Sequence, residues 1–251
     1  VSSAASDVYK RQLYEGYLLV SRLQPSQGRA RLRAGLGEAR ACRDISVLIG
    51  HCVIATLDGR EGHFAEAFAE LAEAERLMHI WDVPPVYYLA MITLVKCELW
   101  LAQGRIDLAE SWLLRLGQTY GGEQPAAAPE FHPLLPLHIA LQQALLERIQ
   151  SRSDDAVQRL ASLVERGQAS GGMMLSVSAL CQWLGLLLGE GREEQAAQLL
   201  PRLLEAAQGG VLQPFQPLLE QHPQWLHEQL QAVAACPVSY THLRAHETSL
   251  H

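Results

Sequence analysis

The sequence lacks the short motifs that mark the common catalytic and nucleotide-binding sites. It contains no G-x-x-x-x-G-K-[ST] phosphate-binding loop, no G-x-S-x-G nucleophile turn and no H-E-x-x-H metal site. Carboxylates at 66, 70, 73 and 75 lie close together, but a solvated helix face explains them better than a catalytic pair. These absences predict a protein that is not an enzyme and that holds no cofactor.

Cysteine pairs with metal-ligand spacing are also absent. The five cysteines are odd in number and widely spaced, and Cys52, Cys97 and Cys181 lie within apolar helical runs. This placement favours small buried side chains in a reducing, cytoplasmic compartment. His51 is adjacent to Cys52, but neighbouring helix residues point about 100° apart and make poor joint ligands. We therefore expect no metal site.

Long apolar runs and positive charge are scarce. No apolar run reaches the roughly 18 residues of a membrane span. Asp and Glu number 27 against 20 Lys and Arg, a net charge of −7. Because phosphate neutralisation requires a basic face, we expect this chain to make no direct nucleic-acid contact. Alternation with a period of two is missing and β-branched residues are few, so no segment is predicted to be a strand.

What the chain does contain is a repeated phrase, clearest in residues 99–117 (LWLAQGRIDLAESWLLRLG). A small residue ends an apolar run, an alanine follows five positions later, and apolar residues lie four and seven positions after the alanine. The copies begin 40 to 47 residues apart, a period that indicates stacked helix pairs. The turn residues are Gly62, Gly104, Ser151 and Gly191, and the alanines are Ala67, Ala109, Ala156 and Ala196.

The repeat predicts an all-α fold, a right-handed superhelix of antiparallel helix pairs resembling tetratricopeptide repeats. Each alanine is expected where two helices cross most closely, because a larger side chain would push the axes beyond about 8–10 Å. A partial N-terminal pair would precede the four complete pairs, with a second helix made ragged by Gly35 and Gly37. Pro201 is expected to kink or restart its helix. The complete pairs are expected at 45–57 with 63–79, 85–103 with 107–120, 134–149 with 154–167, and 173–188 with 192–208, followed by a cap at 212–219 and 224–235.

The two ends of the chain differ from the rest. Residues 1–12 and 237–251 resemble the translated halves of a sequencing adapter, pointing in opposite directions. We therefore expect both to be non-native tails flanking a helical-repeat domain at 13–236, an internal fragment of a longer protein. The alternative is a native polar tail at each end.

Candidate ligand-binding residues are sought on the first helix of each pair, because these inner helices would line a concave groove. His51, Tyr88, Gln182 and Trp183 are the side chains selected on this basis. Core packing is the competing interpretation for the two aromatic residues. No motif links the four residues, so their selection rests on position alone.

The segments GHFAEAFAELAEAERL, LWLAQGRIDLAESWLLRLG and LLGEGREEQAAQLLPRLLEAA resemble the sensor region of the large ATP-binding LuxR-type transcription activators. The segment at 209–219 is similar to the one that closes that superhelix. The resemblance implies an inducer-sensing and oligomerisation domain of a bacterial transcription regulator, binding a small-molecule inducer and self-associating in the parent. A free-standing scaffold that binds a protein segment in its groove is the alternative.

Overall fold

The computed structural model describes residues 3–21, 23–130, 132–210 and 212–234. Over these residues the chain forms twelve α-helices and one 3₁₀ helix, and no strand. The all-α prediction is confirmed, while the handedness of the superhelix stays a prediction. The elements are α1 (Ser3–Ser21), α2 (Pro25–Ala41), α3 (Ser46–Arg60), α4 (Phe64–Ile80), α5 (Pro85–Ala102), α6 (Ile106–Gly121), α7 (Leu135–Ile149), α8 (Ser153–Ala169), α9 (Met173–Gly189), α10 (Glu193–Gln208), η1 (Gln213–Phe215), α11 (Gln216–Gln221) and α12 (Pro223–Ala234).

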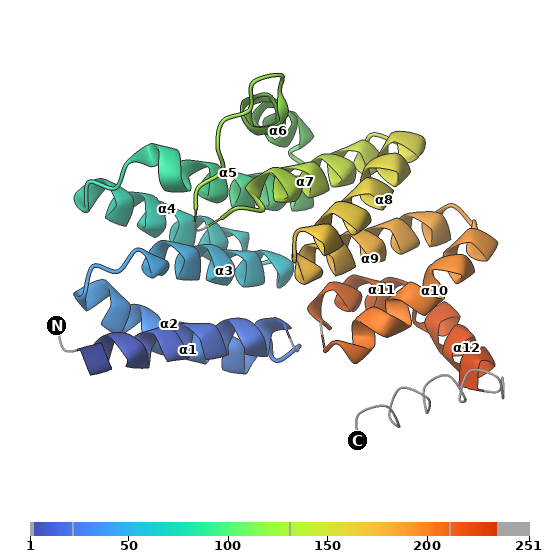
Figure 1. The fold of residues 1–251 in the computed structure, drawn as a ribbon, viewed down its shortest axis with the longest axis horizontal. Helices are drawn as coiled ribbons and strands as arrows, with labels where there is room; N and C mark the ends of the chain where they lie inside the picture. Colours follow the sequence, from blue (N-terminus) through green and yellow to red (C-terminus); the bar gives the residue numbers. More distant parts are fainter. Residues whose placement is uncertain (1–2, 22, 131, 211, 235–251) are drawn as a thin grey trace.

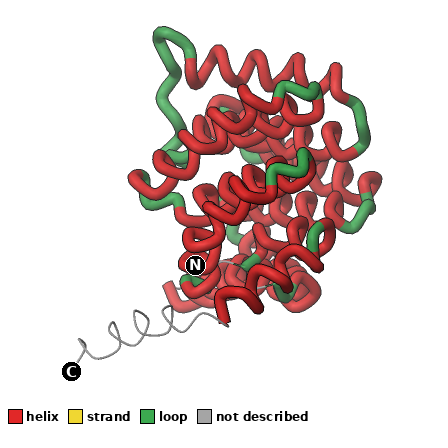
Figure 2. The backbone as a smooth tube through the Cα atoms, turned by 90° about the vertical axis from the view of Figure 1, so that its right-hand side faces the viewer, coloured by secondary structure: helices red, strands yellow, loops and turns green. Residues whose placement is uncertain are grey.

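The helices are arranged as consecutive hairpins. Each odd-numbered helix from α1 to α9 packs against the even-numbered helix that follows it, and α3, α5, α7 and α9 also pack one after another. The 3₁₀ helix η1 packs against α9 and contacts α1, so the two ends of the hairpin series meet (Figure 1). Figure 2 shows the stacked helices joined mainly by short connections, with the longer loop between α6 and α7 projecting at one edge.

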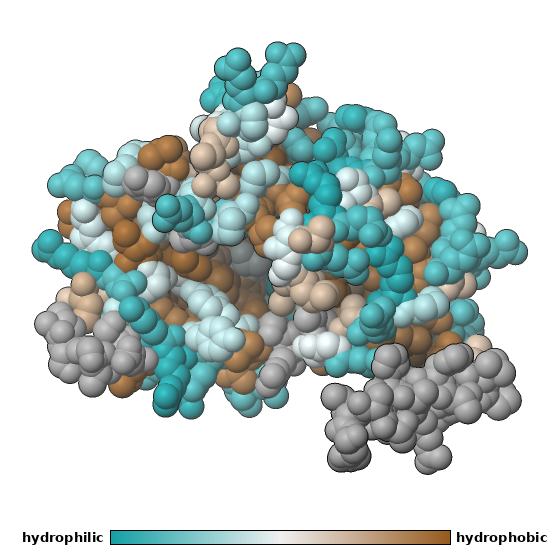
Figure 3. Space-filling view, in the orientation of Figure 1, coloured by the Kyte–Doolittle hydropathy of each residue, from teal (hydrophilic) through white to brown (hydrophobic). Residues whose placement is uncertain are grey.

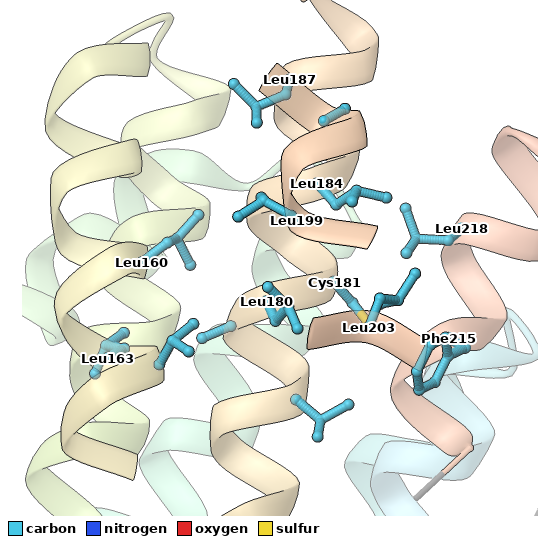
Figure 4. Close-up of a cluster of buried hydrophobic side chains, with 14 of the residues drawn as sticks. Leu160, Leu163, Leu180, Cys181, Leu184, Leu187, Leu199, Leu203, Phe215 and Leu218 are labelled. Atoms are coloured by element: carbon cyan, nitrogen blue, oxygen red, sulfur yellow. The ribbon is translucent and has the colours of Figure 1, made fainter. Parts of the chain in front are cut away.

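The apolar core consists of three buried clusters. One joins the first helices to α3, α4 and α5, a second joins α5, α6 and α7, and the third joins α7 to α10 and the cap. Figure 4 shows the third cluster, in which Leu184 of α9 and Leu203 of α10 lie near Phe215 and Leu218 of the cap. A core divided in this way is expected of repeats that contact mainly their neighbours.

The four turn residues of the repeat share one backbone conformation. Gly62, Gly104, Ser151 and Gly191 have φ of 80°, 74°, 60° and 71°. In each turn the next residue donates its N–H to a carbonyl five positions back, as Arg105 does to Trp100 at 2.8 Å. This is the Schellman ending, in which the left-handed residue stops the helix. The repeat therefore places a left-handed residue where the chain reverses.

The alanines of the repeat lie in the buried interior of the fold. Ala67, Ala109, Ala156 and Ala196 are all 0% exposed. The apolar residues four and seven positions later, Leu113 and Leu116 in the second copy, are also buried. Each copy thus presents one continuous apolar face from α4, α6, α8 or α10 to its hairpin partner.

The first hairpin is more regular than the sequence predicts. α1 runs without interruption across the boundary placed at residue 13, and Tyr9 is buried and donates its hydroxyl hydrogen to Asp44 Oδ2 at 2.6 Å. α2 begins at Pro25 and is continuous, so the expectation of a ragged helix is wrong. A Cβ on Gly28 would lie 2.7 Å from Val20 Cγ2, so glycine lets α1 and α2 approach closely.

Two further predictions concern the C-terminal end of the chain. α10 continues through Pro201, so of the two expected outcomes the restart does not occur and the kink stays a prediction. The cap consists of η1, α11 and α12, in the positions expected for it. The segment 237–251 lies outside the described residues.

Candidate functional site

An open hollow lies where α1, α3 and α9 meet the cap. Its volume is about 220 Å³. Figure 3 shows this face of the molecule hollowed near its centre, between the N-terminal hairpins and the C-terminal half. We call this hollow the central cavity. Its walls are Tyr17, Val20, Val53, Thr56, Leu57, Arg60, Met174 and Gln213.

The cap closes the cavity on one side. Gln213 of η1 faces Arg60, at the end of α3, and its amide oxygen can accept a hydrogen bond from Arg60 Nη2 at 3.0 Å and another from Nη1. Together with the contact between η1 and α1, this interaction joins the first and last parts of the helix series. The cavity therefore depends on closure of the whole repeat array.

Most of the cavity wall is apolar, and the polar groups in it are few. The Tyr17 hydroxyl oxygen is buried and has no hydrogen-bond partner among the described residues. Burial, with a smaller contribution from Cys52, raises the pKa of this phenol well above its usual value, so the group is a neutral donor. Thr56 donates its hydroxyl hydrogen to the Cys52 carbonyl at 3.0 Å, which leaves its oxygen free to accept.

Glu98 of α5 is not one of the cavity-lining residues, but its carboxyl group interacts with the charge of Arg60. Burial raises the pKa of this carboxyl, and the positive charge of Arg60 acts in the opposite direction. No ion pair or hydrogen bond joins Glu98 to any other described residue. An apolar cavity with a few convergent polar groups is the usual form of a small-molecule site.

Of the four residues predicted to bind ligand, Gln182 does not line the central cavity, although it lies on α9, the helix that carries Met174. It lies eight residues after Met174, which lines the central cavity, so both lie on the same stripe of α9. Ser178, between them on this stripe, donates its hydroxyl hydrogen to the Met174 carbonyl at 2.8 Å.

The other three residues lie elsewhere. His51 is 6% exposed and its Nδ1 lies 2.7 Å from Glu70 Oε2, so it joins α3 to α4 and does not line the central cavity. Tyr88 is 4% exposed and borders a separate hollow of about 740 Å³ beside residues 127–130. Trp183 packs on the third core cluster, and its buried indole N–H has no partner in the described part of the chain.

The sequence prediction missed most of the cavity wall. Arg60 was assigned to a turn, but α3 extends to this residue and places it on the same stripe as Val53 and Thr56. That stripe could have been found by extending the helical spacing to the glycine at 62. The roles of Tyr17 and Gln213 as cavity-lining residues could not have been found from the sequence, because they follow from the contact between the two ends of the array.

A separate group of possible metal ligands is already paired with an arginine side chain. Ligand atoms of Asp58, Glu61 and His63 lie within 4.8 Å of one another. The Arg29 guanidinium is 3.0 Å from Asp58 and 3.1 Å from Glu61, so it supplies the positive charge at this position. The group therefore acts as an ion-pair link between α2 and the end of α3.

Three of the cysteines are buried as free thiols. Cys52, Cys97 and Cys181 are free and buried, and burial raises the pKa of each thiol to about 12. Among the described helices, none is both long and apolar enough to cross a membrane.

No family model, curated protein or solved structure matches this chain.

Proposed function

We propose that this chain is a sensing module that binds a small molecule in the central cavity. The observation that supports the proposal is the cavity itself, closed by the cap and lined by apolar side chains with Tyr17, Thr56, Arg60 and Gln213 among them. Its volume is below the roughly 300–1,000 Å³ of sites for drug-sized ligands. A compact metabolite fits such a space.

Ligand binding in this position would be coupled to the shape of the whole array. The walls come from the first, second and fifth hairpins and from the cap, so a ligand that contacts all of them stabilises the closed arrangement. A ligand shifts a conformational equilibrium only by its difference in affinity for the two states. Contacts made only in the closed state would supply that difference.

The resemblance to LuxR-type activators supports a regulatory role for this coupling. In that role the chain is the inducer-sensing domain of a cytoplasmic bacterial transcription regulator that self-associates. The reading frame that contains this chain should then encode a phosphate-binding loop upstream and a helix-turn-helix downstream. A reading frame with neither would refute the regulatory assignment and leave the binding proposal to be tested separately.

The binding proposal is tested by a thermal-shift screen of small metabolites with the wild-type protein and Val53→Trp. A ligand that binds only the folded state raises Tm, and the rise grows with the logarithm of the ligand concentration above Kd. Val53 lines the cavity, so the larger indole should abolish the shift. Ile80→Trp, at a site 54% exposed on α4, is the matched control and should retain it. Equal shifts in all three proteins would place binding outside the cavity.

A further inference from the structure

An open groove follows α7 between α6 and α8. Two adjoining hollows of about 490 and 380 Å³ form it, and Ala140, Arg159 and Arg166 line both of them. Both α6 and α8 pack against α7, so the groove lies over the middle helix of three (Figure 1). We call it the α7 groove. It is separate from the central cavity, because the two share no lining residue.

The guanidinium of Arg159 is held in place on one wall of this groove. Its Nε and Nη2 donate to the Glu147 carboxylate at 2.6–3.1 Å, and its Nη1 donates to Gln143 Oε1 at 3.2 Å. Glu147 is 4% exposed, so a buried carboxylate fixes the orientation of the fork. An arginine carries five N–H donors, so each terminal nitrogen of Arg159 keeps one donor for a ligand.

A second arginine on the same stripe of α8 has no protein partner. Arg166 follows Arg159 by seven residues, about two helical turns, and both line the two hollows. Arg166 is exposed, and no hydrogen bond or ion pair joins it to another residue that the structure describes. A free guanidinium of this kind binds carboxylate and phosphate groups best. The two arginines therefore point to an anionic ligand.

The charge balance of the α7 groove favours a ligand with a single negative charge. Arg159 is paired with Glu147, and Arg152, which lines the smaller hollow, lies 3.0 Å from Asp155. Among the described charged residues that line the groove, Arg166 alone has no counterion. One carboxylate supplies that counterion. A doubly charged phosphate monoester would add a further negative charge to a groove that already contains two carboxylates.

The larger hollow offers an apolar surface beside the arginines. Leu114 is 59% exposed, and the partly buried Tyr120 and Pro136 line the same hollow. Gly121 also lines it and leaves space, because a Cβ there would meet no heavy atom within 4 Å. The volume of about 490 Å³ is in the range of small-molecule sites. An aromatic ring suits the tyrosine and proline side chains, which are themselves rings.

We propose that the α7 groove is a second binding site, for an aromatic monocarboxylate. The carboxylate pairs with Arg166 and accepts hydrogen bonds from the remaining donors of Arg159, and the ring packs against Tyr120 and Pro136. This site goes beyond the proposed function, because it needs no ligand in the central cavity. It uses the third and fourth hairpins, which contribute nothing to the wall of that cavity.

The test is isothermal titration at pH 7 with indole-3-propanoate and three compounds that change only its charged end. These are indole-3-propanamide, which is neutral, tryptamine, which is a cation, and indoxyl phosphate, which is a dianion. The carboxylate should bind more tightly than each of them. Arg166→Gln should weaken its binding at least about 10-fold. Arg166→Lys, which keeps the charge, should weaken it less, and Arg105→Gln, at an exposed site on α6's N-terminal turn, should leave it unchanged.

A pair of glycine substitutions locates the bound ligand. Gly121→Trp fills the larger hollow and should abolish binding of indole-3-propanoate. Gly37→Trp is the matched control, because a Cβ on this exposed glycine of α2 also meets no heavy atom within 4 Å. It should retain binding, as should Val53→Trp, which fills the central cavity instead. Circular dichroism at the titration temperature confirms that each variant is folded.

The outcomes keep this inference apart from the proposed function. An amide, amine or phosphate that binds as tightly as the carboxylate overturns the inference, as does an unchanged affinity in Arg166→Gln. Loss of binding in Val53→Trp with retention in Gly121→Trp also overturns it and places the ligand in the central cavity. Failure of indole-3-propanoate to bind overturns the inference alone, since the metabolite screen tests the central cavity separately.

Discussion

Replacing Ala67 by leucine should weaken the packing on which the repeat depends. Ala67 lies in α4 at the position that the repeat phrase assigns to closest helix approach, and its side chain is 0% exposed. Leucine adds three carbon atoms at a site with no exposed surface into which they could turn. Overpacking of this kind typically costs about 1–3 kcal/mol. Alanine and leucine are both strong helix formers, so helix propensity contributes little.

The same helix provides a matched control. Ala69 is exposed, two residues away on the opposite side of α4, so Ala69→Leu makes the identical chemical change in solvent. We expect it to change stability by less than about 0.5 kcal/mol. Urea unfolding followed by circular dichroism measures both variants, and for a chain of this size each kcal/mol corresponds to roughly 2–4 °C in Tm. Equal stability of the two variants would refute the assignment of Ala67 to the crossing point.

The remaining predictions concern the turns, the thiols and one partly buried histidine. Gly104→Ala should lower the free energy of unfolding by about 1 kcal/mol, and Ser151→Gly should raise it by a similar amount, because both positions have positive φ. Urea unfolding measures both changes, and a more stable Gly104→Ala or a less stable Ser151→Gly would contradict this prediction. Cys181, a buried thiol with a pKa of about 12, should react with a disulfide reagent at pH 8 only at the rate of unfolding, and rapid labelling of the folded protein would refute its burial. Burial, with a smaller contribution from His132, lowers the pKa of His138 to about 4, so the neutral ring is favoured on folding. Stability should be full above pH 6.5 and fall as the pH drops from 6.5 to 4, by up to about 3 kcal/mol; His138→Phe should unfold in urea with a smaller loss between pH 7 and pH 4.5, and an identical loss would be inconsistent with this pKa.

The fold was predictable because its determinants are local. Gly104 and Ser151 share a turn conformation that few residue types adopt easily, and the alanine five positions later marks a contact that tolerates only a small side chain. Both signals recur at a fixed spacing, so the helix pairs could be placed from sequence. The continuous α2 was not predicted, because Gly35 lowers helix propensity in isolation but lies against α1 in the fold, where a Cβ on it would be 3.0 Å from Leu13 Cδ2.

The candidate site was less predictable because it depends on contacts between distant parts of the chain. Gln182 lies on α9, an inner helix, but it does not line the central cavity. His51 occupies an inner helix as well, but Glu70 on α4 holds its side chain away from the central cavity. Tyr17 and Gln213 become neighbours of one cavity only when the last element reaches the first helix, which depends on the pitch accumulated over five hairpins. No local pattern in the sequence encodes that closure.

Methionine-methyl NMR tests most directly whether the central cavity is the binding site. The chain has four methionines, of which Met174 lines the cavity and Met78 is 7% exposed in the first core cluster. With the methionine methyl carbons labelled, pools of amino acids and neutral sugars are titrated into the protein. The account predicts a saturable shift of the Met174 signal by at least one compound, with the Met78 signal unchanged. Binding that leaves the Met174 signal unmoved, or the absence of any shift with every pool, would contradict it.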